Sequence, residues 1–429
     1  MNKIIDLSTY DIRFPTSKLL DGSDAMNKDP DYSASYVILH TNTNNEGHGL
    51  SFTIGRGNEI CIKAIEAMKH LIVGLEVEWI KNNLGGFWKK ITRDSQLRWI
   101  GPEKGAIHLA TSAIVNAVWD LLAKEEEKPV WQFVSEMPSE KLLSIIDFRY
   151  LTNVISPREA LLMLKKLERS KFERIEKLKL EGYPSYTTSA GWLGYTDEKL
   201  KKLCQEIRKL GFTHAKFKVG KNIDDDIRRM KIVREELGND FNIMIDANQV
   251  WEVDEAIDWI NKLSFSKPLF IEEPTSPDDI IGHKTIRDNI KPIKVASGEM
   301  CQNRIMFKQF ISEKAIDIVQ IDACRLGGLN EVLSVLLMAK KFNLPVWPHA
   351  GGVGLCEYVQ HLSMIDYIVI SGEKDTKRIE YVDHLHEHFI NPCILKQGAY
   401  MPPKNPGFSI QMKTNSIYKW KFKVKNEIT

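Results

Sequence analysis

The chain has 429 residues, and its 59 Lys and Arg nearly balance its 57 Asp and Glu, which gives a formal charge of +2. This near-neutrality argues against charge-driven binding to nucleic acid or to an anionic membrane. Hydrophobic residues make up 43% and charged residues 27% of the chain. That composition is ordinary for a globular protein and excludes wholesale disorder, collagen-like repeats and coiled coils.

The cysteines and the N-terminus indicate a reducing compartment. Six cysteines are scattered without a CxxC pair, which argues against a zinc knuckle or a thioredoxin-type redox site. No apolar run approaches the roughly 20 residues of a membrane span. The stretch Met1–Arg13 contains acidic residues and is typical of a strand rather than of a signal peptide. We therefore expect a cytoplasmic protein, and a mitochondrial address stays open.

The N-terminal part has the pattern of a small α+β domain. Antiparallel strands are expected over Lys3–Phe14, Ser35–Asn42 and Gly47–Ile54, and helices near Asn58–Leu75, Gly85–Arg98 and Ala106–Glu127. A polar loop, Leu20–Asp31, joins the first two strands. Further along, Pro157–Leu180 interleaves acids and bases, which indicates a solvated helix or an insertion rather than a nucleic-acid-binding face.

From about residue 200, short apolar strands alternate with amphipathic helices. The expected strands are Ala215–Val219, Asn242–Asp246, Leu269–Glu273, Ile293–Glu299, Ile316–Asp322 and Pro345–His349. This alternation implies parallel βαβ units. The repeat length suits a (β/α)8-type barrel better than an open doubly wound sheet, whose Gly-rich phosphate turn is missing. The first barrel strand is either Leu143–Tyr150 or the stretch near Tyr186–Ser189.

We therefore predict an α/β protein with three parts. An N-terminal α+β capping domain spans residues 1–140, and a (β/α) barrel catalytic domain spans 141–390. A C-terminal segment, 391–429, returns to the cap.

Each apolar strand ends in an ionisable residue. These residues are Lys218, Asp246, Glu272, Glu299, Asp322 and His349, at steps of 23 to 28 residues. A lone charge at a strand end usually only starts a loop. In a barrel, however, all six would meet at the carboxyl-end face, where active sites lie.

Three of these residues predict a metal site. Asp246, Glu272 and Glu299 would repel one another without a cation. A set of oxygen ligands favours Mg²⁺ over Zn²⁺. The alternative is that Lys or Arg side chains pair with the three carboxylates.

The remaining groups predict acid–base chemistry. Lys216 and Lys218 have strand spacing and point to one face. Each amine would lower the pKa of the other, and the metal beside them would lower it further. A neutral lysine is a competent base; salt-bridged core lysines are the alternative. Asp322 would orient His349 as the opposite acid or base. A metal that grips a substrate carboxylate acidifies the α-proton, and one base then removes it.

These residues resemble the enolase superfamily, mandelate racemase subgroup. Within that subgroup the chain looks most like the L-fuconate dehydratases. The similar segments are Arg98–Lys104, Ile271–Asp279, His349–Glu357 and Glu380–His384.

The resemblance implies a Mg²⁺-dependent hydro-lyase that acts on an acid sugar. Lys218 would abstract the C2 proton, Lys216 would bind the carboxylate, and His349 would protonate the departing C3 hydroxyl. L-Fuconate would give 2-keto-3-deoxy-L-fuconate and water. The family also implies substrate contacts from the cap loop, from Glu299 and from a late barrel loop: Gly22, Ser23, Asp24, Tyr32 and Glu380.

Several other residues attract notice. Trp192 lies near a possible edge of the site but is expected to be a core aromatic, and His214 is expected to be structural. His384, His386 and His388 alternate, but a zinc site would need a carboxylate or thiol partner that the sequence does not identify, so we expect a surface or packing role.

Two alternatives remain open. The same groups could run a racemase or epimerase, or dehydrate another acid sugar. A binding protein for a metabolite or for RNA is the alternative of another class. The expected partner is a small acid sugar, with no nucleic acid and no membrane, and we expect a homo-oligomer.

Overall fold

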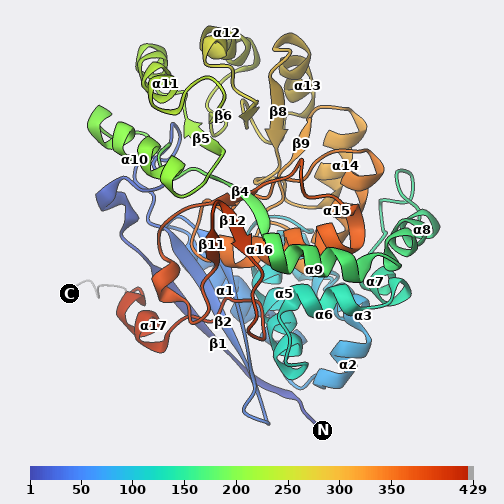
Figure 1. The fold of residues 1–429 in the computed structure, drawn as a ribbon. Coiled ribbons are helices and arrows are strands. Elements are labelled where there is room, and N and C mark those ends of the chain that lie inside the picture. Colours follow the sequence, from blue (N-terminus) through green and yellow to red (C-terminus); the bar gives the residue numbers. More distant parts are fainter. Residues whose placement is uncertain (424–429) are drawn as a thin grey trace.

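The computed structural model describes residues 1–423. Figure 1 shows a three-stranded sheet, in blue, at one end of the molecule and the parallel strands β5–β9 toward the other. The blue sheet is antiparallel in the order β1-β2-β3, with β1 at Ile4–Arg13, β2 at Ser33–Thr41 and β3 at Glu46–Thr53. The predicted bounds of these strands are within two residues of the observed ones.

Helix α5 (Gly105–Glu125) lies very close to β3. A Cβ atom at Gly49 would lie 2.1 Å from the carbonyl oxygen of Ala113, and one at Gly47 would lie 2.3 Å from that of Ala117. Only glycine permits this approach between strand and helix. The sheet and α5 therefore form one rigid base for the loop between β1 and β2.

Helix α5 also corrects a prediction. Its 21 residues are long and apolar enough to cross a membrane, but 83% of its most apolar window is buried inside the fold. The expectation that no apolar run approaches such a length was wrong for this helix. A helix that is apolar nearly all round is expected when protein covers nearly all its faces.

Several helices connect the first sheet to the barrel. They are α1 (Asn58–Met68), α2 (Val77–Asn82), α3 (Leu84–Thr92), α4 (Leu97–Ile100), α6 (Val130–Glu136), α7 (Ser139–Ile145), α8 (Pro157–Glu168) and α9 (Lys171–Glu181), with the 3-10 turns η1 (Thr16–Leu19) and η2 (Lys69–Leu71).

The charged stretch forms two helices, α8 and α9, rather than one. Helix α8 begins with a capping box, in which Ser156 and Glu159 each bond the other's backbone N–H. Both helices bury one side, through Leu164 and Leu178. Arg174 is also buried and donates to the carbonyl oxygen of Ile368 at 2.9 Å. The stretch is thus solvated on one side only and packs onto the fold with the other.

The barrel sheet runs in the order β11-β12-β4-β5-β6-β7-β8-β9, with β10 beside β4. Its strands are β4 (Tyr183–Thr187), β5 (His214–Lys218), β6 (Asn242–Asp246), β7 (Phe270–Glu272), β8 (Lys294–Ser297), β9 (Ile318–Val319), β10 (Ile379–Tyr381), β11 (Ile394–Lys396) and β12 (Ala399–Met401). Strands β4 to β9 are mutually parallel, as the βαβ pattern predicts.

Two contacts close the ring of strands. Val319 forms a parallel bridge with Val346, and Glu380 N–H donates to the carbonyl oxygen of Pro348 at 3.4 Å. Because β10 also pairs with β4, the segment around residue 346 completes the cylinder. One layer of its interior contains six large or apolar side chains, Tyr186, Met244, Phe270, Ala296, Ile318 and Trp347. The α/β fold with a barrel and a cap is confirmed.

The first barrel strand is β4, so the second of the two predicted positions is correct. The other candidate overlaps helix α7. The predicted strand Ile316–Asp322 forms a strand only over β9, and Pro345–His349 forms a bridge at Val346. The N–H groups of Trp347 and His349 also donate to the carbonyl oxygens of Val319 and Ile321, at 2.9 and 3.0 Å.

Helices follow the strands around the barrel. They are α10 (Asp197–Lys209), α11 (Ile223–Leu237), α12 (Val253–Leu263), α13 (Ile280–Asn289), α14 (Arg304–Ser312), α15 (Leu329–Lys341) and α16 (Leu355–Ile365), with the 3-10 turn η3 (Ser264–Ser266) and the π-helical turn η4 (Asp366–Ser371).

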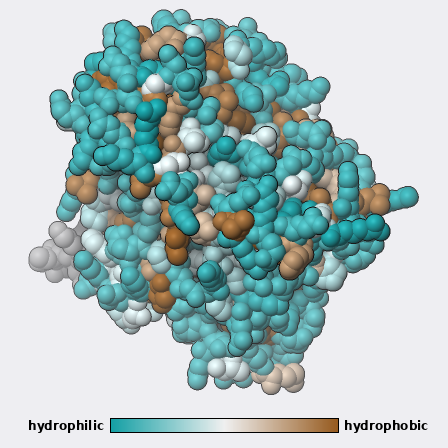
Figure 2. All heavy atoms as spheres, viewed as in Figure 1, coloured by the Kyte–Doolittle hydropathy of each residue, from teal (hydrophilic) through white to brown (hydrophobic). Residues whose placement is uncertain are grey.

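The C-terminal segment touches both parts of the protein. Strand β12 pairs with β4. After helix α17 (Thr414–Trp420), Phe422 N–H donates to the carbonyl oxygen of Asp11 on β1 at 2.7 Å. Residues 424–429 of the predicted segment lie outside the described residues. In Figure 2 the visible face is mostly hydrophilic, with apolar residues scattered over it.

Candidate active site

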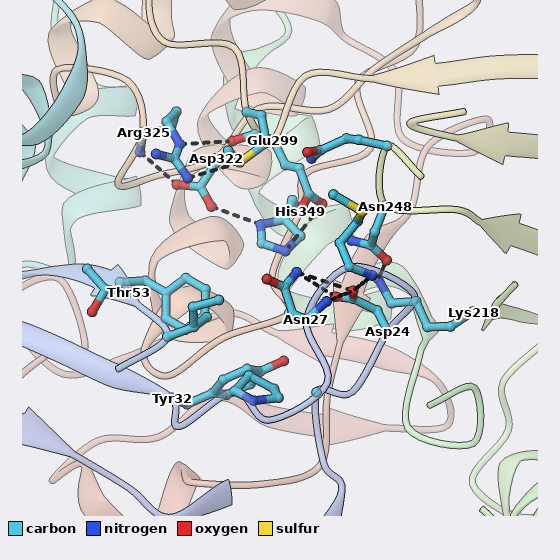
Figure 3. A pocket seen from close by; sticks show the side chains of 18 of the residues that line it. Asp24, Asn27, Tyr32, Thr53, Lys218, Asn248, Glu299, Asp322, Arg325 and His349 are labelled. Atoms are coloured by element: carbon cyan, nitrogen blue, oxygen red, sulfur yellow. Dashed lines mark hydrogen bonds and ion pairs between the residues drawn. The ribbon is translucent and has the colours of Figure 1, made fainter. Parts of the chain in front are cut away.

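A cavity of about 440 Å³ lies at the carboxyl ends of the barrel strands, beneath the loop between β1 and β2. Five of the residues predicted from the barrel line it: Lys218, Glu299, Asp322, His349 and Glu380. Figure 3 shows Lys218 and Asn248 on one side of this cavity and His349 with Asp322 on another. The strand ends therefore do converge on one face, as the spacing predicts.

Two lysines on β5 reach the same carboxylates. Lys216 Nζ lies 2.6 Å from Glu272 Oε1, 3.1 Å from Asp246 Oδ2 and 3.0 Å from Glu380 Oε1. Lys218 Nζ lies 2.5 Å from the same Asp246 oxygen. Lys216, Asp246 and Glu272 are almost fully buried behind the cavity wall. The ion pairing that was the alternative to a metal site is thus present in this structure.

Without a metal, these ion pairs keep both lysines charged. Burial alone would lower the pKa of Lys218, but the charge of Asp246 and of other nearby carboxylates outweighs it and raises that pKa above its usual value. The pKa of Lys216 is raised in the same way, with Glu272 the main charge. The carboxylates thus outweigh repulsion between the two amines, and a neutral lysine stays a prediction for the site with its metal bound.

The carboxylates nevertheless fit a hard dication. Asp246 and Glu272 are register partners at the ends of β6 and β7, and Glu299 follows the next strand, β8. All the donor atoms are oxygens, which Mg²⁺ prefers. Glu299 Oε2 is buried and has no hydrogen-bond partner. A cation would satisfy this oxygen and relieve the repulsion among the three acids.

His349 and Asp322 form a tight pair. His349 Nδ1 lies 2.8 Å from Asp322 Oδ2, and its Nε2 lies 3.5 Å from Glu299 Oε2. Asp322 Oδ1 in turn accepts from the backbone N–H groups of Cys324 and Arg325, both at 2.7 Å. Burial would lower the pKa of His349, but the charges of Glu299, Asp322 and Glu380 raise it to about 10. The imidazole therefore holds a proton that it can deliver toward the cavity.

Glu380 is held at the cavity edge by several donors. Its Oε2 accepts from the backbone N–H of Ala350 at 2.7 Å, and its Oε1 accepts from the Thr188 hydroxyl. Burial would raise its pKa, but Lys216 and His349 lower it to about 2. Glu380 thus lies as a carboxylate between the lysine pair and the imidazole.

The cap loop contributes three of the four predicted residues. Gly22, Asp24 and Tyr32 line the cavity, but Ser23 does not. The Ser23 hydroxyl instead donates to the carbonyl oxygen of Lys28 at 3.2 Å, inside the loop. Asp24 Oδ1 accepts from the backbone N–H groups of Met26 and Asn27 at 2.8 and 2.6 Å. Ser23 therefore shapes the loop and does not face the cavity.

Some residues that line the cavity were not predicted from the sequence. Asn248 accepts from Lys218 Nζ at 2.7 Å through its side-chain oxygen, and its φ of 45° places it in the left-handed region. Its position two residues after a strand-end aspartate was the available signal. Trp192, noted in the sequence near a possible site edge, is a core aromatic as predicted, and it also lines the cavity with its ring centre 5.5 Å from Lys218 Nζ. Arg325 lines it as well, with no signal in the sequence. His214 packs on Trp347 as a structural residue.

Comparisons with known proteins agree with this architecture. Residues 26–134 match the family described as mandelate racemase / muconate lactonizing enzyme, N-terminal domain, and residues 199–416 match the family described as enolase C-terminal domain-like.

The chain is also similar over nearly its whole length to several known proteins. It is 55% identical to an L-galactonate dehydratase of Hypocrea jecorina over 99% of this chain and 95% of that protein. It is 54% identical to mitochondrial enolase superfamily member 1 of Xenopus laevis, over 98% and 95%. The crystal structure of the human mitochondrial enolase superfamily member 1 superposes with a TM-score of 0.97, at 51% identity, covering 98% of this chain and 96% of that one. The chain therefore belongs to the enolase superfamily, and the mandelate racemase subgroup fits it.

Proposed function

We propose that the protein is a Mg²⁺-dependent dehydratase of acid sugars. The observation that carries the proposal is the placement of Lys218 and the Asp322–His349 pair at separate sides of one cavity, with carboxylates between them. A base on one side and an acid on another are what β-elimination of water requires. The similar protein named L-galactonate dehydratase supports this reaction class.

Asp246, Glu272 and Glu299 would hold the ion. When bound, Mg²⁺ would neutralise charge on the substrate carboxylate and on Asp246, which favours both loss of the C2 proton and the neutral form of Lys218. Lys218 Nζ would take the C2 proton, and Lys216 would bind the carboxylate that gains charge. His349 Nε2 would give its proton to the C3 hydroxyl as water leaves. Asp322 would keep the imidazole oriented.

The substrate proposed from the sequence resemblance is L-fuconate, which would give 2-keto-3-deoxy-L-fuconate. L-Fuconate is L-galactonate without its C6 hydroxyl, so the similar protein named L-galactonate dehydratase favours a second candidate that differs only at C6. The specificity constant for the two acids, measured side by side, decides between them. A site that pairs with the C6 hydroxyl would reject L-fuconate strongly, whereas an apolar site would separate them only modestly.

The test is a screen of monoacid sugars with Mg²⁺, in which semicarbazide detects the 2-keto acid. We expect turnover that a chelator abolishes and that added Mg²⁺ restores. Exchange of the C2 proton with solvent without loss of water would indicate a racemase or epimerase instead. Binding of acid sugars without exchange or keto acid would indicate the non-catalytic alternative. We also propose a cytoplasmic homo-oligomer, which ultracentrifugation and cell fractionation can test.

A further inference from the structure

A second cluster of metal-binding side chains lies where the C-terminal segment meets α16. Glu357 is in the first turn of α16, His386 is in the 3-10 turn η5 (His386–His388), and Cys393 directly precedes β11. One ligand atom from each of these side chains lies within 4.8 Å of the other two. These are the carboxylate and thiol partners that the sequence did not identify for the histidine cluster.

His386 is held with one nitrogen aimed at the other two side chains. Its Nδ1 lies 2.7 Å from Glu357 Oε1 and 3.6 Å from Cys393 Sγ. Its Nε2 donates to the carbonyl oxygen of Val382 at 2.7 Å, and its ring stacks on Tyr381 with 8° between the planes. A metal-binding histidine generally donates from its second nitrogen to such an acceptor. The orientation of Nδ1 therefore does not depend on Glu357 or Cys393.

A second thiol lies beside the cluster but outside it. Cys356, next to Glu357, donates to the carbonyl oxygen of Ala350 at 3.7 Å, and both Cys356 and Cys393 are free cysteines. Glu357 and Cys356 are each only 1% exposed. The side chain of His386 is 18% exposed, which leaves a path for an ion from solvent.

We propose that Glu357, His386 and Cys393 bind one Zn²⁺-class ion, with water from solvent in the fourth position. Thiolate and imidazole select zinc-like ions over Mg²⁺. The 3.6 Å between Cys393 Sγ and His386 Nδ1 matches the ~3.5 Å between a sulfur and a nitrogen bound to one tetrahedral centre. The Glu357–His386 contact would open by roughly 0.6 Å to fit the same centre. Binding releases the Cys393 thiol proton and the His386 Nδ1 proton to solvent.

The site is tested with Co²⁺, which reports sulfur ligation by its charge-transfer absorption. The full-length protein is freed of metals, given a large excess of Mg²⁺ to fill the oxygen site, and titrated with Co²⁺. We expect an intense sulfur-to-cobalt band that saturates at one equivalent. Cys204, buried in α10 and outside the cluster, supplies the matched control: Cys204→Ala should keep the band. Cys393→Ser and His386→Asn should each weaken Co²⁺ binding at least tenfold.

Absence of a sulfur band from the wild-type protein at several equivalents of Co²⁺ would overturn the proposal and leave a buried Glu–His ion pair. X-ray absorption of the wild-type protein with one equivalent of Zn²⁺ keeps the test valid if a variant fails to fold. A Zn–S distance of about 2.3 Å is expected, and a shell of oxygen atoms alone contradicts the site. Neither readout depends on dehydratase activity, so this proposal and the proposed function can fail separately.

Discussion

Two buried charge clusters lie between the N-terminal domain and the barrel, and they differ in how well their charges are matched. In the first, Glu331 of α15 accepts from Arg304 Nη1 at 3.0 Å, from His108 Nε2 at 2.6 Å and from Gly327 N–H at 2.8 Å. Arg304 also pairs with Glu103 at 3.1 Å. Both oxygens of Glu331 therefore have N–H partners.

The active-site cluster is incomplete by comparison. Asp246, Glu272, Glu299, Asp322 and Glu380 outnumber Lys216, Lys218 and His349, and Glu299 Oε2 has no hydrogen-bond partner. With every group charged, the excess is two negative charges. Arg304 Nε in the first cluster also lacks a hydrogen-bond partner, but both oxygens of Glu331 are paired. A carboxylate with both oxygens paired stabilises the fold, whereas an excess of carboxylates beside a cavity fits a site that receives a dication and an anionic substrate.

The largest expected effect comes from the unmatched cluster. Lys218→Ala should lower turnover by about 10²–10⁴-fold, because a positioned base is removed, and should abolish C2 exchange in deuterated water. Lys294→Ala, at the exposed opposite end of β8, is the control. Turnover near the wild-type value in Lys218→Ala would show that another group is the base.

His349→Asn separates the two halves of the reaction. We expect dehydration to fall by a similar factor of about 10²–10⁴, while C2 exchange, which needs only Lys218, continues. Proton NMR of the substrate in deuterated water measures exchange, and semicarbazide measures the keto acid. His70→Asn, at an exposed position, should change neither. Unimpaired dehydration in His349→Asn would refute its role as the acid.

A substitution in the cluster around Glu331 should instead lower the free energy of unfolding. Glu331→Gln leaves His108 without its anionic partner and removes one of the carboxylates that pair with Arg304, so we expect a loss of roughly 3–5 kcal/mol in the free energy of unfolding, measured by urea denaturation. Glu313→Gln removes an exposed pair with Lys284, and such pairs contribute about 0–1 kcal/mol. An equal loss in the free energy of unfolding in the two variants would show that the buried Glu331 stabilises the fold no more than the exposed Glu313 does.

Lowering the pH should remove the stabilisation that the Glu331 carboxylate provides. Burial would raise the pKa of Glu331, but His108 and Arg304 lower it to about 2, from 4.5 in the unfolded chain. A lowered folded-state pKa means that stabilisation is complete above about pH 4.5 and is lost as the pH falls toward 2. The difference in stability between wild type and Glu331→Gln should shrink over that range, by on the order of 3 kcal/mol. A constant difference would exclude this linkage.

The smallest effect is expected at Ser23. Its hydroxyl bonds inside the cap loop, so Ser23→Ala should cost only about 1 kcal/mol of stability and leave KM unchanged within a factor of two or so. Asp24→Asn, on the cavity wall, should raise KM more. Steady-state kinetics with the best acid sugar measures both, and the reverse order would place Ser23 in contact with substrate.

Much of the barrel could be predicted from the sequence, because its chemistry repeats with the strands. Asp246 and Glu272 each end a short apolar run, and parallel strands bring such ends together. The first strand was ambiguous because an apolar run such as Leu142–Ile146 suits a short helix or a strand equally well. Tertiary packing decided that it forms the end of helix α7.

What the sequence could not supply was the contact between distant residues. The protonation of Lys218 depends on Asp246 Oδ2 at 2.5 Å, and a pattern of residue types contains no such distance. His386 contacts Glu357 and Cys393 only because the C-terminal segment folds back onto α16. Ser23 and Asp24 are neighbours in the sequence, yet only Asp24 faces the cavity.

The path of residues 391–423 along the barrel limits where the protein can be truncated. Strand β12 covers the outer edge of β4, and from it the Tyr400 hydroxyl donates to the carbonyl oxygen of Glu380 at 2.6 Å. An expression fragment that stops at residue 390 would therefore lose the support of a cavity-lining carboxylate as well as a sheet edge. An engineered protein that contains this barrel will therefore need the residues after 390 as well.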